Sequence, residues 1–260
     1  MSTRKRGEVH IQSLERASRI LDVLIKNGTA TLGEITSATG LNKTTVYYLV
    51  ESLAALGFAQ RVVGGEGYCL GLRNLELGRS VQRRQDIVAA SRPALIRLCT
   101  LSRETVNLAV PYLFDAMIVE SMEGTHGVRA TSYAGSRALY HATACGKAIL
   151  AYLEADTIES ILNSRPLDQL TPNTITNPQV LSAQLAEVRL RGYAVEMEEN
   201  ELNAHCVAAP IWNGFGSIAG AISISGLASR LPPKVLNELS VEIVAECQSI
   251  SKSLGLLSRD

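Results

Sequence analysis

The succession of helix signals between residues 13 and 70 constrains this chain more than any other feature. Apolar residues recur at helical spacing in three successive stretches, at about residues 13–26, 31–40 and 42–56. Thr31 and Asn42 stand at the starts of the second and third stretches, where a side-chain oxygen can accept a hydrogen bond from a free backbone N–H. We therefore expect three helices that pack around one small core.

A glycine-rich turn follows the third helix. Two short extended runs, residues 58–63 and 68–70, flank the turn GGEG at residues 64–67, and three glycines in four residues favour a hairpin. Three helices followed by a hairpin predict a winged helix-turn-helix, a fold that binds double-stranded DNA. Arg61 lies in this wing, where we expect it to meet a DNA phosphate. Three packed helices that bind no DNA are the alternative.

The third helix divides its side chains between two faces. Its apolar residues share one side and are expected to pack against the first two helices: Val46, Leu49, Val50, Leu53 and Leu56. The other side is polar near its start, where a recognition helix contacts bases. We expect Thr44, Tyr47 and Tyr48 in the major groove. Lys43 is expected beside the DNA backbone. Thr45 is a further DNA-binding candidate, whose hydroxyl can meet a phosphate or a base edge, but it lies nearer the packed side. Two tyrosines buried in the core are the alternative.

The net charge of zero hides an asymmetry along the chain. Residues 1–84 hold 12 Lys and Arg against 7 Asp and Glu, whereas residues 85–260 hold 13 against 18. A basic N-terminal part followed by an acidic remainder indicates two domains with different partners. We place a DNA-binding domain at residues 1–71, a connecting helix at 72–84 and a second domain at 85–260. The basic residues 4–6 are expected to form a solvated tail, or alternatively a minor-groove arm.

The second domain alternates strand and helix signals. Strands are expected at about residues 105–110, 116–121, 128–133, 206–210 and 218–225. Helices are expected at about residues 143–153, 178–192 and 233–254. Strands interleaved with helices indicate an α/β domain built on one sheet.

Cysteine usage and hydropathy bear on the compartment. The five cysteines are odd in number and form no CxxC motif, and no apolar run approaches the roughly 18 residues of a membrane span. The N-terminus lacks the apolar stretch of a secretory signal. These features favour reduced thiols in a cytoplasmic protein that has no membrane partner.

Several motifs together resemble the IclR family of bacterial transcriptional regulators, over roughly residues 10–255. In the first domain they are SLERASRILDVL, GLNKTTVYYLVESLAALGF and YCLGLRNLELG. In the second they are RETVNLAV, HATACGKAILA, RGYAVEMEENELNAHCVAAPI and AISISG. The resemblance implies a winged helix-turn-helix, a linker helix and a GAF-like effector domain with one mainly antiparallel sheet.

The same resemblance implies a function. It implies a homodimer, or a dimer of dimers, whose affinity for operator DNA changes when a small-molecule effector binds. Repression is favoured over activation, and neither enzymatic activity nor a cofactor is expected. Two departures stand out, because Tyr47 and Tyr48 occupy positions where relatives carry histidine or a basic residue. Operator sequence therefore does not carry over from relatives.

The resemblance also carries over six effector-pocket positions: Ala144, Cys145, Glu196, Cys206, Ser223 and Ser225. Ser223 and Ser225 are two residues apart and share one face of a strand. Backbone amides at Ala144 and Cys145 would suit the carboxylate of a small catabolite, whereas an ionised Glu196 would repel it. Simple packing is the alternative for each position.

Two further readings stay open. Cys145 with His141 nearby would serve as nucleophile and base in a thiol enzyme of GAF-like fold. The second domain would otherwise only dimerise a constitutive DNA-binding protein. Cysteine and histidine together also invite a metal site, but their spacing matches no zinc pattern.

Overall fold

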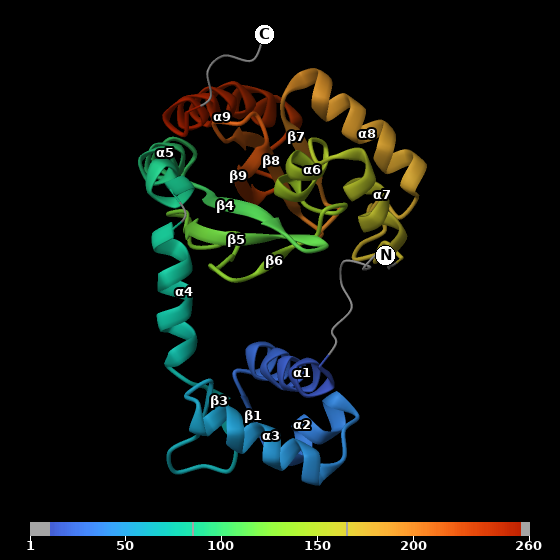
Figure 1. Ribbon diagram of the computed structural model, residues 1–260. Helices are drawn as coiled ribbons and strands as arrows, with labels where there is room; N and C mark the ends of the chain where they lie inside the picture. Colours follow the sequence, from blue (N-terminus) through green and yellow to red (C-terminus); the bar gives the residue numbers. More distant parts are fainter. Residues whose placement is uncertain (1–10, 85, 165, 256–260) are drawn as a thin grey trace. The chain divides into compact units, whose positions relative to one another are not determined.

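The computed structural model describes residues 11–84, 86–164 and 166–255. The chain forms two compact units, residues 1–84 and 85–260, each with its own core (Figure 1). The basic residues 4–6, considered above as a minor-groove arm, lie outside the described residues. Each unit is therefore described by itself.

The N-terminal unit is a winged helix-turn-helix, as the sequence predicts. Its helices are α1 (Gln12–Asn27), α2 (Leu32–Thr39), α3 (Lys43–Ala55) and α4 (Arg73–Arg84). Its strands are β1 (Thr29–Ala30), β2 (Ala59–Arg61) and β3 (Tyr68–Leu70), which form an antiparallel sheet in the order β1-β3-β2. The strands β2 and β3 make the wing.

Side-chain caps define the helix-turn-helix. The Thr31 hydroxyl accepts a hydrogen bond from the backbone N–H of Glu34, whose side chain accepts one from the Thr31 N–H in return. Asn42 Oδ1 accepts from the Thr45 N–H at 2.8 Å at the start of α3. The expectation that Leu56 belongs to the packed side is wrong. It follows the last residue of α3 and is 58% exposed, because the helix ends before it can turn inward.

The C-terminal unit is built on one six-stranded antiparallel sheet, in the order β6-β5-β4-β9-β8-β7. The strands are β4 (Thr105–Tyr112), β5 (Asp115–Met122), β6 (Arg137–Ala138), β7 (Ala194–Met197), β8 (Ala204–Trp212) and β9 (Ile218–Leu227). The helices are α5 (Asp86–Ser102), α6 (Ala144–Leu150), α7 (Ala155–Ser164), α8 (Pro178–Arg191) and α9 (Pro233–Ser253).

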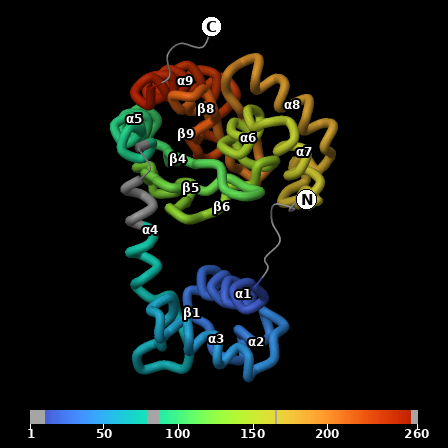
Figure 2. Tube along the Cα trace, in the orientation of Figure 1, coloured from blue at the N-terminus to red at the C-terminus, as the bar shows by residue number. Residues whose placement is uncertain are grey.

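Helices cover both faces of this sheet (Figure 1; Figure 2). Helices α5 and α9 pack on one face, and α6, α7 and α8 lie on the other. Successive residues of β8 therefore enter opposite cores: Val207 packs toward α9 and Ala208 toward α6. Because both faces are buried, the central strands read as continuous apolar runs.

Several elements differ from the sequence prediction. The prediction of a strand at residues 128–133 is wrong. This segment is a loop, held at Ala130 by a hydrogen bond from the Thr105 hydroxyl to its carbonyl at 2.6 Å. The short strand β6 lies after it. Helices α5 and α7 and strand β7 were not predicted. In α5, Pro93 stands inside the helix and hides its pattern.

The helices were compared with the length and apolarity of a membrane span. Among the described residues, none of the helices combines the length and apolarity that crossing a bilayer requires.

Two glycines of the N-terminal unit provide a matched test of its packing. A Cβ atom added at Gly71 would lie 2.1 Å from the Gly57 carbonyl oxygen, whereas one added at Gly78 in α4 meets nothing within 4 Å. We expect Gly71→Ala to lower the free energy of unfolding of this unit by about 1–3 kcal/mol or more. Gly78→Ala should raise it by about 0.4–1 kcal/mol. Calorimetric unfolding of both variants measures this, and equal effects would contradict the packing described.

Candidate nucleic-acid interface and ligand cavity

The outer face of α3 carries exposed polar and aromatic side chains. Lys43 and Thr44 are exposed, and Thr45 is half-buried, as expected from its place on the helix. Tyr47 is 43% exposed and Tyr48 is 66% exposed. Their rings meet edge to face, with centroids 5.5 Å apart. The alternative in which these tyrosines belong to the core is therefore wrong, and the face is available to a partner.

The wing approaches this face through an ion pair. Arg61 Nη2 lies 2.6 Å from Glu51 Oε1 of α3, and the Tyr68 hydroxyl donates to the same oxygen at 2.6 Å. The Arg61 side chain remains 64% exposed. Arg61 is therefore in the wing as predicted, but it has a partner inside the domain that the sequence did not reveal.

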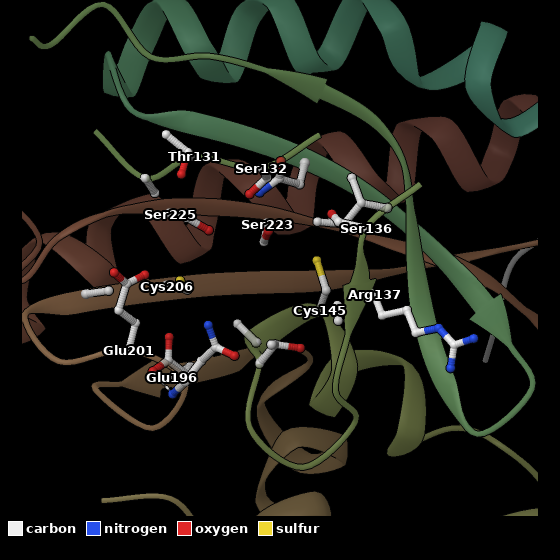
Figure 3. A pocket seen from close by; sticks show the side chains of 18 of the residues that line it. Thr131, Ser132, Ser136, Arg137, Cys145, Glu196, Glu201, Cys206, Ser223 and Ser225 are labelled. Atoms are coloured by element: carbon white, nitrogen blue, oxygen red, sulfur yellow. Dashed lines mark hydrogen bonds between the residues drawn. The ribbon is translucent and has the colours of Figure 1, made fainter. Parts of the chain in front are cut away.

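The C-terminal unit contains a cavity of about 220 Å³ on the α6 side of the sheet. All six expected effector residues line it: Ala144, Cys145, Glu196, Cys206, Ser223 and Ser225. Figure 3 labels all of them except Ala144. The sequence did not point to its other polar lining residues: Asn107, Thr131, Ser132, Tyr133, Ser136, Arg137, Thr143, Asn200 and Glu201. The cavity thus combines strand side chains with two loops and the start of α6.

Strand register brings the polar lining together. On β8, Cys206 pairs with Glu196 of β7 on one side and with Ser225 of β9 on the other. Ser223, two residues before Ser225 on β9, pairs with Asn107 of β4. Because antiparallel partners project to the same face, these side chains form a polar patch on the cavity floor.

Burial raises the pKa of three acidic side chains that line the cavity, Cys145, Cys206 and Glu196. It raises the pKa of the Cys145 thiol to about 12, against a smaller lowering by a hydrogen bond with Ser223. It also raises the pKa of Cys206 and that of the Glu196 carboxyl. Glu196 Oε1 accepts backbone N–H groups from Glu199 at 2.6 Å and Asn200 at 3.1 Å. The cavity therefore offers hydroxyls, thiols and a carboxyl whose pKa burial raises.

Glu199, whose backbone N–H binds the Glu196 carboxyl, forms a buried ion pair with Lys147. Lys147 of α6 is fully buried, and its Nζ lies 2.6 Å from Glu199 Oε1 and 3.1 Å from Gln184 Oε1 of α8. Burial lowers the pKa of Lys147, and the Glu199 carboxylate opposes this. Lys147 therefore ties α6, α8 and the turn after β7 together.

The geometry does not assemble Cys145 and His141 into a nucleophile and base. His141 Nε2 is hydrogen-bonded to the Asp168 carbonyl at 2.9 Å, and the imidazole lines a separate small cavity beside Tyr140. The raised pKa keeps the Cys145 thiol protonated near neutral pH. Within the described ranges, no cluster of three or more His, Cys, Asp or Glu side chains is placed to hold a metal ion.

A winged helix-turn-helix followed by an α/β domain is the architecture of a two-domain DNA-binding transcriptional regulator. Two family profiles match the chain: the IclR helix-turn-helix domain at residues 13–62, and the bacterial transcriptional regulator IclR C-terminal domain at residues 79–252. The chain belongs to the IclR family of transcriptional regulators, as its motifs suggested.

Similar proteins include characterised regulators and solved structures. The transcriptional regulator KipR of Bacillus subtilis is 32% identical over 244 residues, which cover 94% of this chain and 97% of KipR. The transcriptional repressor IclR of Escherichia coli is 30% identical, covering 94% and 90%. The crystal structure of Thermotoga maritima IclR is 32% identical and covers 95% of this chain and 100% of that chain, with a TM-score of 0.72.

One further structure shares the fold and contains a ligand. An IclR homologue from Microbacterium hydrocarbonoxydans, in complex with 4-hydroxybenzoate, has a TM-score of 0.80. It is 24% identical and covers 94% of this chain and 99% of that chain.

The buried ion pair gives a test of how the cavity is supported. Lys147→Met leaves the Glu199 carboxylate buried without its cation, so the free energy of unfolding of the C-terminal unit should fall by about 3–5 kcal/mol. Adding Glu199→Gln should recover part of this loss. Denaturant unfolding can be followed by the fluorescence of Trp212, the single tryptophan. Lys234→Met, at an exposed position of α9, is the control and should change little. Equal stability of both single variants would contradict the role of the pair.

Proposed function

We propose that the protein represses transcription as a cytoplasmic homodimer, or dimer of dimers, that releases or tightens its hold on operator DNA when a small catabolite enters the C-terminal cavity. The observation that carries the proposal is the convergence of all six expected effector residues on one cavity, in a chain that also exposes the N-terminal half of its recognition helix. Enzymatic activity is not part of this function.

The face of α3 supports the DNA-binding half of the proposal. Lys43 and the N-terminus of α3 favour a phosphate, and Thr44, Tyr47 and Tyr48 project from the exposed side. A tyrosine hydroxyl donates to phosphate or to a base edge, and its ring contacts a thymine methyl. We assign these three residues to the major groove.

The chemistry of the cavity favours a small carboxylated effector with further polar groups. Backbone N–H groups of Ala144 and Cys145 and the hydroxyls of Ser223 and Ser225 are suitable partners for a carboxylate. Burial raises the pKa of Glu196, and a proton taken up together with the ligand would let this carboxyl donate a hydrogen bond to it. Without that proton, the ionised carboxylate would repel a carboxylated ligand.

Signal transfer is assigned to α4, which follows the wing directly. In this proposal, effector binding re-packs the dimerised C-terminal units, and α4 passes the change to the spacing of two recognition helices. Spin labels on the wings of a dimer would report that spacing, and identical distances with and without effector would refute this route.

Tyr48 provides the sharpest test of base contact. Tyr48→Ala should weaken binding to a selected operator by about tenfold, while binding to a scrambled duplex changes much less, because the ring meets base edges. Gel-shift titrations on both duplexes measure this. Phe215→Ala removes a ring that is 96% exposed in the C-terminal unit and is the matched control. Equal losses on both duplexes would remove Tyr48 from base readout.

A thermal-shift screen tests the effector site. The probes are a panel of small carboxylates that includes 4-hydroxybenzoate, the ligand of the Microbacterium relative. A ligand at 100 times its dissociation constant should stabilise the protein by about 2.7 kcal/mol. Ser223→Ala should weaken the affinity for this ligand by about fivefold to tenfold through loss of one hydrogen bond. Ser217→Ala, in an exposed turn, should leave that affinity unchanged. A protein that binds operator DNA but none of a broad panel would favour the constitutive alternative.

A further inference from the structure

Glu51 is the single acidic side chain of α3. It follows Thr44 by seven residues and Tyr47 by four, so it continues the stripe that the proposed function assigns to DNA. A free carboxylate on such a stripe is repelled by phosphates and lowers affinity for any duplex. The surroundings of Glu51 therefore decide what it does there.

The wing neutralises and orients this carboxylate. Arg61 and Tyr68 are cross-strand partners in β2 and β3, and both bond Glu51 Oε1 at 2.6 Å. The Arg61 guanidinium also lies over the Tyr68 ring, 5.3 Å from its centroid. Tyr68 is 5% exposed, which fixes one of the two donors within the core of the N-terminal unit. The two strands thus hold the Glu51 side chain in one orientation.

One oxygen of Glu51 remains for an outside partner. Among the residues that the structure describes, both side-chain donors to Glu51 bond Oε1, and the Glu51 side chain is 34% exposed. The hydrogen bond from Tyr68, followed by that from Arg61, lowers the pKa of Glu51. The group is therefore ionised at neutral pH, and it accepts hydrogen bonds without donating any. In the major groove, the matching donors are the exocyclic amino groups of cytosine and adenine.

We propose that Glu51 is a specificity-determining residue that accepts a hydrogen bond from the amino group of one cytosine or adenine in each operator half-site. It disfavours guanine and thymine at that place, because their acceptor oxygens face the carboxylate. Arg61 and Tyr68 act as positioning residues: Arg61 neutralises the Glu51 carboxylate, and both hold it in one orientation. This inference rests on the proposed function, since it requires α3 in the major groove.

Selection of binding sites from a randomised duplex library tests the proposal with full-length protein. The wild-type protein should select cytosine or adenine at one position of each half-site. Glu51→Ala should lose about fivefold to tenfold discrimination at that position and keep its preferences elsewhere. Glu51→Gln should shift the choice toward adenine, which an amide recognises through both donor and acceptor. Tyr68→Phe, which removes only a hydroxyl, should weaken the same preference in part.

The control is Glu66→Ala, which removes one negative charge from the exposed wing turn outside the pair. It should strengthen binding to all duplexes alike and leave the selected sequence unchanged. Glu51 variants that keep the wild-type preference at every position, or lose all preferences together, overturn the inference. A folded wild-type protein that selects no sequence overturns the proposed DNA-binding function, and this inference with it.

Discussion

The sheet of the C-terminal unit is covered by helices on both faces, and the two faces are filled by side chains of different size. Toward α9, β8 and β9 present branched residues such as Val207, Ile211 and Ile222. Toward α6, the same strands present Cys206, Ser223 and other small side chains. Close packing of larger residues on that side would fill the space. The cavity therefore depends on small residues at alternate positions of two neighbouring strands.

All six expected cavity positions came from the family resemblance, and the period of a strand added one point to it. Ser223 and Ser225 share a face by spacing alone, whereas Cys206 and Glu196 could be assigned only through the family resemblance. Their pairing depends on the register between β7 and β8, which is a tertiary property. The buried state of Lys147 was not foreseen for the same reason, since its partner Glu199 lies 52 residues further along the chain.

The loop over the cavity shows where local pattern fails. Residues 128–131 alternate apolar and polar side chains, which is typical of a strand. The hydrogen bond from Thr105 to the Ala130 carbonyl and the turn at Tyr133–Ser136 hold this segment as a loop instead. In the N-terminal unit, caps and helical period predicted α3 well. The contact of Glu51 with the wing was not predictable, because it forms only when β2 folds back on the helix.

The two units have separate cores with no residue in common. The N-terminal core is centred on Ile20, Ile35 and Val46, and the C-terminal cores are built from residues that follow Gln85. A substitution within one core acts first on the packing of its own unit. Under the proposed function, operator preference and ligand preference can therefore diverge independently during evolution, so that a duplicated gene can acquire a new effector while it keeps its old operator, or the reverse.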